Sequence, residues 1–152
     1  MRGMSPTFRL ATSDDLPAML ALYRHLSPED PLLEPEQVRA DYARLIGSDL
    51  ASLLVADVGG AVVASCLLLI VPNLTRGGRP FAIIENVVTH SDHRRQGLGT
   101  RLLALASKRA QAANCYKLML ATGRSDEGVL RFYEQAGFTR GGKTFFEMRW
   151  VD

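Results

Sequence analysis

Residues 81–106 read FAIIENVVTHSDHRRQGLGTRLLALA, and this stretch decides the architecture. Its first part, residues 81–89, is apolar and rich in β-branched side chains, which is typical of a strand. A turn rich in arginine and glycine follows, and leucines at helical spacing predict a long helix over about 97–114. The free N–H groups at the start of that helix, with two glycines that allow close backbone approach, predict an anion site that would fit a pyrophosphate.

Two common phosphate-binding patterns are excluded. A dinucleotide fingerprint needs a third glycine, and Leu102 stands at that position. Residues 137–144 read GFTRGGKT and match the GxxxxGKT spacing, but they follow the helix expected at 127–135 and precede an expected strand, whereas an ATP-binding loop of that type joins a strand to a helix, so that type is also excluded. The pattern that remains is Arg94-x-x-Gly97-x-Gly99 after an apolar strand.

The elements around this stretch predict an α+β layered fold. The expected elements are a strand at 7–11, helices at 12–26 and 34–47, strands at 53–58, 61–71 and 81–89, a helix at 97–114, a strand at 117–121, a helix at 127–135, and a final strand pair near Phe138 and at 145–151. Gly59-Gly60 between two β-rich runs is a strong hairpin signal. The order βααβββαβαβ(β) predicts a mixed, mostly antiparallel sheet flanked by helices.

Length and composition restrict the function classes. With 152 residues, of which 47% are hydrophobic and 22% charged, we expect one folded domain over 1–152. No apolar run approaches the ~20 residues of a membrane helix, and no apolar leader begins the chain, so we expect a cytoplasmic protein. Cys66 and Cys115 lie in apolar surroundings and are expected to be reduced thiols rather than metal ligands or a disulfide.

The charged residues do not predict nucleic-acid or metal binding. Net charge is +2, and no aromatic residues interleave the basic stretch of Arg94, Arg95, Arg101, Lys108 and Arg109. A solvated helix face beside a phosphate ligand is therefore the better interpretation. His90 and His93 have HxxH spacing, but no further ligand type is near them in sequence, so we interpret them as loop residues and expect no metal.

Two segments together resemble a known superfamily. Arg94-x-x-Gly97-x-Gly99 is similar to the [RQ]-x-x-G-x-[GA] signature of the GNAT acyl-CoA-dependent N-acetyltransferases, at the same strand-to-helix junction. About 40 residues on, the stretch RFYEQAGF at 131–138 resembles their second signature, a helix that ends in [LF]-Y-x-x-x-G-F. The element order also agrees, so the resemblance covers nearly the whole chain.

Within this superfamily the chain looks most similar to glucosamine-6-phosphate N-acetyltransferases. The similar segments are 84–88, 114–117 and 147–149. One departure concerns the amine site, because Ala121 stands where those enzymes carry an acid on the fifth strand. A second departure is Asp126, where many members of the superfamily have asparagine.

The resemblance implies an acetyl-CoA site at the strand-to-helix junction. Backbone N–H groups of residues 95–100 would hold the CoA pyrophosphate, and Arg94 and Arg95 would add positive charge. A backbone N–H of the fourth strand near Val88 would face the thioester oxygen. The expected cofactor-binding residues are Val87, Val88, Arg94, Arg95, Gln96, Gly97, Leu98, Gly99 and Thr100.

Two side chains are candidate catalytic residues. Glu85 lies in an apolar strand, where burial would raise its pKa and suit it to remove a proton from an ammonium group, through water. Simple strand alternation would place it on the same face as Ile83 and Val87. Tyr133, from the resemblance, would protonate the leaving CoA thiolate. Structural roles for both residues remain open alternatives.

These observations predict acetyl transfer from acetyl-CoA to a primary amine of a small molecule or amino sugar, by direct attack in a ternary complex. Two alternatives remain open: a protein lysine or N-terminal acetyltransferase, and a non-catalytic acyl-CoA-binding module. The resemblance also implies a possible homodimer, with the last strand at 145–151 as a pairing edge.

Overall fold

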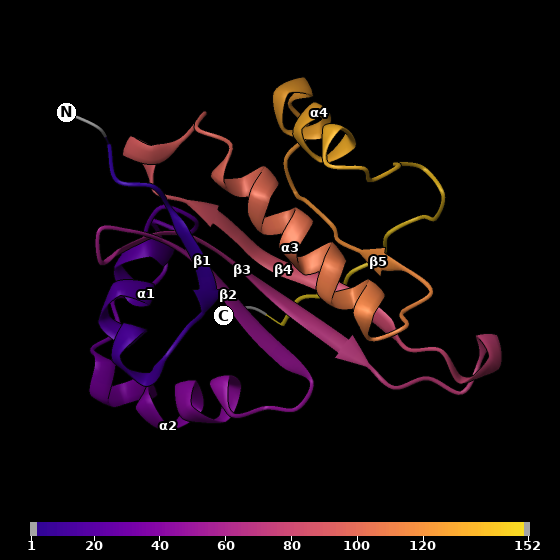
Figure 1. Ribbon diagram of the computed structural model, residues 1–152, viewed down its shortest axis with the longest axis horizontal. Coiled ribbons are helices and arrows are strands. Elements are labelled where there is room, and N and C mark those ends of the chain that lie inside the picture. The colour runs from indigo at the N-terminus through magenta and orange to yellow at the C-terminus, as the bar shows by residue number, and fades with distance from the viewer. Residues whose placement is uncertain (1–2, 151–152) are drawn as a thin grey trace.

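A mixed β-sheet forms the centre of the computed structural model, which describes residues 3–150 (Figure 1). Within that range five strands lie in the order β1-β2-β3-β4-β5. They are β1 Thr7–Leu10, β2 Ala51–Val58, β3 Ala61–Val71, β4 Phe81–Thr89 and β5 Leu118–Met119. The first three pairs are antiparallel, and β4 and β5 are parallel. The predicted α+β class with a mixed, mostly antiparallel sheet is confirmed.

Helices cover both faces of this sheet. They are α1 Leu16–Tyr23, α2 Pro35–Ile46, α3 Leu98–Ala112 and α4 Glu127–Gln135. Apolar residues of β2 alternate between the two faces, so that Leu53 and Val55 pack toward α1 and α2, whereas Leu54 and Ala56 pack toward α3. None of the helices within residues 3–150 is both long enough and apolar enough to span a bilayer.

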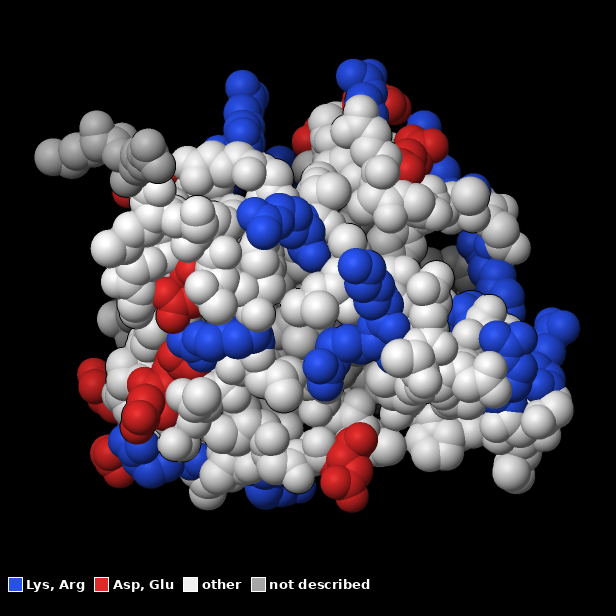
Figure 2. Space-filling view, in the orientation of Figure 1, with Lys and Arg blue, Asp and Glu red and all other residues white. Residues whose placement is uncertain are grey.

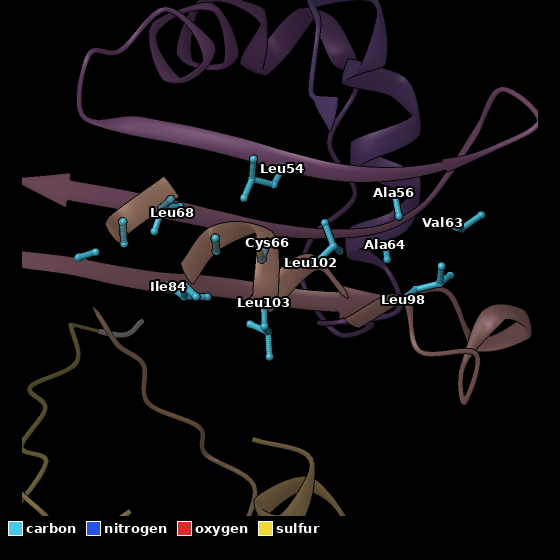
Figure 3. Packing of buried hydrophobic residues seen from close by; sticks show 13 residues of the cluster. Leu54, Ala56, Val63, Ala64, Cys66, Leu68, Ile84, Leu98, Leu102 and Leu103 are labelled. Carbon is cyan, nitrogen blue, oxygen red and sulfur yellow. The ribbon is translucent and has the colours of Figure 1, made fainter. Parts of the chain in front are cut away.

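The larger of the two core clusters lies between the sheet and α3. Side chains from three adjacent strands, among them Leu54, Leu68 and Ile84, surround Leu102 and Leu103 of the helix (Figure 3). All of these are at most 1% exposed. Full burial of each such side chain stabilises the fold by about 1.5–3 kcal/mol, so this cluster fixes α3 on β4.

The Gly59-Gly60 hairpin is confirmed. Both glycines have positive φ, +63° and +90°, as a primed two-residue turn requires, and Val58 pairs with Ala61. This turn sets the register of β2 and β3 and, through them, the position of β4.

Strand β4 contains a β-bulge that the sequence analysis did not predict. Ser65 of β3 pairs with Val88, but Leu67 pairs with Glu85, so β4 has one extra residue opposite Cys66. Asn86 takes a φ of +54° there. The predicted alternation is therefore wrong beyond Glu85: Val87 packs on the α3 side and Val88 on the side of α1 and α2.

The expected strand pair at the C-terminal end is also wrong within the described residues. Residues 138–150 include no strand, and Val151 lies outside the described range. The apolar alternation is present, but a strand forms only where a neighbour satisfies its N–H and C=O groups. Phe146, Met148 and Trp150 are instead 87%, 74% and 87% exposed.

An ion-pair network joins β1, the turn before α1, and β2. The Arg9 guanidinium donates to both carboxylate oxygens of Asp15, at 2.7 and 3.0 Å, and to Asp57 at 3.0 Å. The Thr12 N–H also donates to Asp15, at 2.7 Å. Asp15 is nearly buried, and its hydrogen bonds from Arg9 hold its pKa below the ordinary 3.8.

Replacing Asp15 with asparagine should therefore destabilise the fold. Charge-assisted hydrogen bonds of this kind contribute about 2 kcal/mol, and for a chain of this size we expect Tm to fall by roughly 4–8 °C at pH 7. Because the folded pKa is depressed, the carboxylate's contribution is present above its unfolded pKa and is lost as pH falls through the folded pKa. The Tm difference between wild type and Asp15→Asn should thus shrink below about pH 4.

Thermal unfolding at several pH values measures this difference. Asp14→Asn is the matched control, because Asp14 is the exposed neighbouring aspartate. A constant Tm difference from pH 7 to pH 2 would contradict the assigned role of the carboxylate.

Candidate active site

A cleft opens where β4 and β5 separate. The two strands pair at Ala82 with Leu118 and at Ile83 with Met119, and the ladder then ends. Beyond that point residues 84–89 of β4 and residues 120–124 after β5 line a cleft of about 1150 Å³, together with the start of α3 and one side of α4. The backbone edge of β4 therefore faces open space along the cleft.

Most of the predicted site residues meet in this cleft. Those that line it are Glu85, Val87, Val88, Arg94, Arg95, Gly97, Leu98, Gly99, Thr100 and Tyr133. Gln96, which the sequence analysis also assigned to the cofactor, is exposed and does not line it. The structure thus brings both candidate catalytic side chains to the same cleft as the start of α3.

The turn before α3 presents backbone N–H groups to the cleft. Arg95 and Gly97 both have positive φ, +61° and +77°, which turns successive peptide N–H groups toward one side. In the described structure no side chain caps the first turn of α3. Its unpaired N–H groups and the positive end of the helix dipole are therefore available to an anion.

The two glycines of this turn have different roles. A Cβ at Gly97 would meet nothing within 4 Å, so its positive φ is what favours glycine. A Cβ at Gly99 would lie 3.0 Å from Cζ of Phe132. Glycine at position 99 therefore allows α4 to approach the start of α3 closely.

Replacing Gly97 with valine should weaken acetyl-CoA binding at least tenfold. A β-branched residue is strained at φ +77°, by about 1–2 kcal/mol or more, and relief of that strain would turn the N–H groups away from the cleft. Isothermal titration calorimetry measures the effect. Gly142→Val is the control, because Gly142 has open space and no positive φ. Equal affinity for the Gly97 variant and wild type would rule out this anion site.

Glu85 differs from its sequence-based expectation. It is exposed in the open cleft, directly before the bulge at Asn86, rather than buried among apolar neighbours. The expected burial of Glu85 among apolar neighbours is therefore wrong. Its exposed carboxylate is instead accessible to water and to a ligand in the cleft.

Tyr133 combines a packed ring with access to the cleft. Its ring contacts Phe132 and Phe138 in edge-on arrangements, with centroids 4.9 and 6.3 Å away. Burial raises the pKa of the phenol, and the nearby Cys66 adds to this effect, whereas Arg124 opposes it. Tyr133 also lines the cleft, so its phenol is accessible to a group bound there.

The sequence analysis missed several residues that line the cleft. They are His25, Leu26, Ser27, Arg124, Phe145, Glu147 and Arg149 among others. The ring of His25 packs against that of His90, with centroids 4.0 Å apart and a tilt of 42°, although 65 positions separate the two residues. Burial lowers the pKa of His25, the nearby His90 and Arg94 lower it further, and Asp92 opposes them. No local sequence signal links such distant positions.

Lys and Arg side chains are spread among uncharged groups over the face that carries α3, with acidic side chains toward the edges (Figure 2). Among residues 3–150, no three or more His, Cys, Asp or Glu side chains are grouped so as to hold a metal ion. Both cysteines are free thiols, and burial raises the pKa of Cys66 to about 12.

Comparison with known families now identifies the chain. The profile of the acetyltransferase (GNAT) family matches residues 16–138, which include the sheet from β2 to β5 and all four helices. The chain belongs to the GNAT family of acetyltransferases.

Individual GNAT proteins agree with this assignment. A glucosamine 6-phosphate N-acetyltransferase from Trypanosoma brucei brucei is 35% identical over 131 residues, which cover 86% of each protein. A solved structure from Agrobacterium tumefaciens, assigned as an acetyltransferase, is 44% identical with a TM-score of 0.92, over 95% of this chain and 99% of that one.

A more distant solved structure shares the fold alone. It is an aminoglycoside N-acetyltransferase solved in complex with CoA, at 17% identity and a TM-score of 0.80, over 99% of this chain and 98% of that one.

Proposed function

We propose that this GNAT protein transfers the acetyl group of acetyl-CoA to a primary amine of a small molecule or amino sugar, by direct attack in a ternary complex. The observation that carries the proposal is the meeting of three groups in one cleft: the uncapped start of α3, the Glu85 carboxylate and the Tyr133 phenol. Together they offer an anion site, a proton acceptor and a proton donor.

The start of α3 fits the phosphates of acetyl-CoA. The N–H groups from Arg95 to Thr100 would hold the pyrophosphate, and the exposed Arg94 and Arg95 would add charge. When bound, acetyl-CoA supplies an activated acetyl thioester. The free backbone edge of β4 near Val88 would donate to the thioester oxygen as negative charge develops there.

The two candidate catalytic residues would move protons at opposite ends of the reaction. Glu85 would accept a proton from the acceptor ammonium through water, so that the free amine nitrogen forms the new C–N bond. Tyr133 would donate its proton to the sulfur as the C–S bond breaks, and the second proton, which the nitrogen releases as it becomes an amide, would return to the phenolate. Its raised pKa keeps the phenol protonated at neutral pH, as this role requires.

CoA release, measured with acetyl-CoA and a panel of amines, tests the proposal. The panel contains glucosamine 6-phosphate, polyamines, amino acids and short peptides. We expect amine-dependent release with a small amine or amino sugar, in keeping with the trypanosomal relative's substrate. Release with peptides alone would favour a protein acetyltransferase. If no amine causes CoA release although acetyl-CoA binds, the result would favour a non-catalytic acyl-CoA-binding module.

The exposed C-terminal segment supports a second part of the proposal, a homodimer. Phe146, Met148 and Trp150 form an apolar face without a partner among the described residues, and a second copy would cover it. Light scattering measures the mass of the protein in solution directly.

We also propose a cytoplasmic location, where acetyl-CoA is present and the free Cys66 and Cys115 stay reduced.

A further inference from the structure

A second pocket, of about 450 Å³, lies between α1 and the loop that follows it. We call it the side pocket. Most of its lining is apolar: Leu20, Ala21, Leu26, Leu32, Leu33 and three prolines. Leu32 and Leu33 are 77% and 47% exposed at its rim. Its volume falls in the range of small-molecule sites, about 300–1000 Å³, and the prolines restrict the backbone around it.

The side pocket adjoins the active-site cleft. Leu26, Ser27 and Asn86 line both. Asn86 is the bulge residue of β4, and its chain neighbour Glu85 is the proposed proton acceptor. A molecule whose body fills the side pocket can therefore extend past Asn86 and present its end to Glu85.

The charges of the side pocket do not suit a phosphate group. Arg24 is the cation in its lining, and its guanidinium donates to the carbonyl oxygens of Pro28 and Asp30, at 2.5 Å each. It is therefore engaged in holding the loop. The Asp30 carboxylate adds a negative charge to the same lining. A phosphorylated sugar would bring like charge and many hydroxyl groups to a wall that is largely apolar.

We propose that the side pocket binds the apolar body of the acceptor, so that the preferred substrates are primary amines on an alkyl or aryl group. This inference rests on the proposed function, because it names the acceptor class of the same site. The amino group would lie beside Glu85, and the apolar body would displace water from the leucine side chains. A polar, anionic amino sugar would gain little from this wall.

A series of linear primary amines tests the proposal in the wild-type protein. Ethylamine, butylamine and hexylamine have nearly the same amine pKa, so they differ mainly in apolar length. If each added CH₂ enters the side pocket, kcat/KM should rise about fourfold per carbon, or roughly 250-fold over the four carbons from ethylamine to hexylamine. Hexylamine and phenethylamine should also exceed glucosamine 6-phosphate.

A pair of variants assigns the effect to this pocket. Ala21→Phe places a ring in the side pocket from an exposed position of α1, and it should lower kcat/KM for hexylamine at least tenfold, with KM for acetyl-CoA unchanged. Ala40→Phe makes the same change at an exposed position of α2 that lines neither pocket nor cleft. It should behave as wild type.

The outcomes separate the two proposals. If amines are acetylated but kcat/KM does not depend on chain length, or glucosamine 6-phosphate is preferred, the side-pocket inference is overturned and the acetyltransferase stands. An unchanged preference for hexylamine in Ala21→Phe would also overturn it. If no amine is acetylated while acetyl-CoA binds, both proposals fail.

Discussion

Replacing Glu85 with glutamine is expected to lower kcat about 100-fold at pH 7, the low end of the range for loss of a general base. Glutamine has nearly the same shape but cannot accept the ammonium proton. At higher pH a growing fraction of the acceptor amine is already neutral, so the difference from wild type should diminish. A pH series of kcat measured from CoA release displays this convergence.

Glu29→Gln is the matched control for this experiment. Glu29 is exposed on the loop after α1 and lines neither the cleft nor the side pocket. It should retain wild-type kcat at every pH. A Glu85 variant with the full rate and the wild-type pH profile would assign the carboxylate a structural role instead, and His25, which lines the same cleft, would become the next base to test.

The second large effect is expected for Tyr133→Phe. Loss of the phenolic proton should lower kcat by about 100-fold, because the departing thiolate would have to take its proton from water. Phenylalanine keeps the edge-on contacts with Phe132 and Phe138, so the free energy of unfolding and the KM for acetyl-CoA should change little. Steady-state kinetics together with thermal unfolding separates these effects.

The alkaline side of the wild-type pH profile gives an independent check on Tyr133. Burial raises the pKa of the phenol above its ordinary 10.0, so the alkaline decline of kcat should come at a higher pH than an ordinary tyrosine would give. Tyr116→Phe, at a half-buried tyrosine outside the cleft, is the control. Undiminished turnover in Tyr133→Phe would leave the ring with a packing role alone.

Local patterns predicted much of the fold. The Gly59-Gly60 turn, strand 81–89 and helix 127–135 are where the sequence indicated them, because each depends on the conformational preferences of neighbouring residues. The turn before α3, where we propose the anion site, also lies where the sequence indicated it. Its positive φ values at Arg95 and Gly97 follow from a short run of chain.

Features that depend on distant segments were not predicted. Period-two alternation in β4 held only as far as Glu85, because the pairing with β3 accommodates an extra residue at Asn86. Asparagine tolerates positive φ better than most residues, and this was the one local sign of the bulge. The exposure of Glu85 and the contact between His25 and His90 arise from packing between segments, which a single sequence does not display.

The close approach of Phe132 to Gly99 has a consequence for how this cleft can evolve. The same helix that presses Phe132 against the start of α3 carries Tyr133 on the next residue. Position 99 therefore sets the spacing between the turn proposed to bind the anion and Tyr133, the proposed proton donor. A larger residue at position 99 would push α4 outward and lengthen the distance from the start of α3 to the Tyr133 phenol. The size of this one residue therefore sets the width of the cleft between α3 and α4.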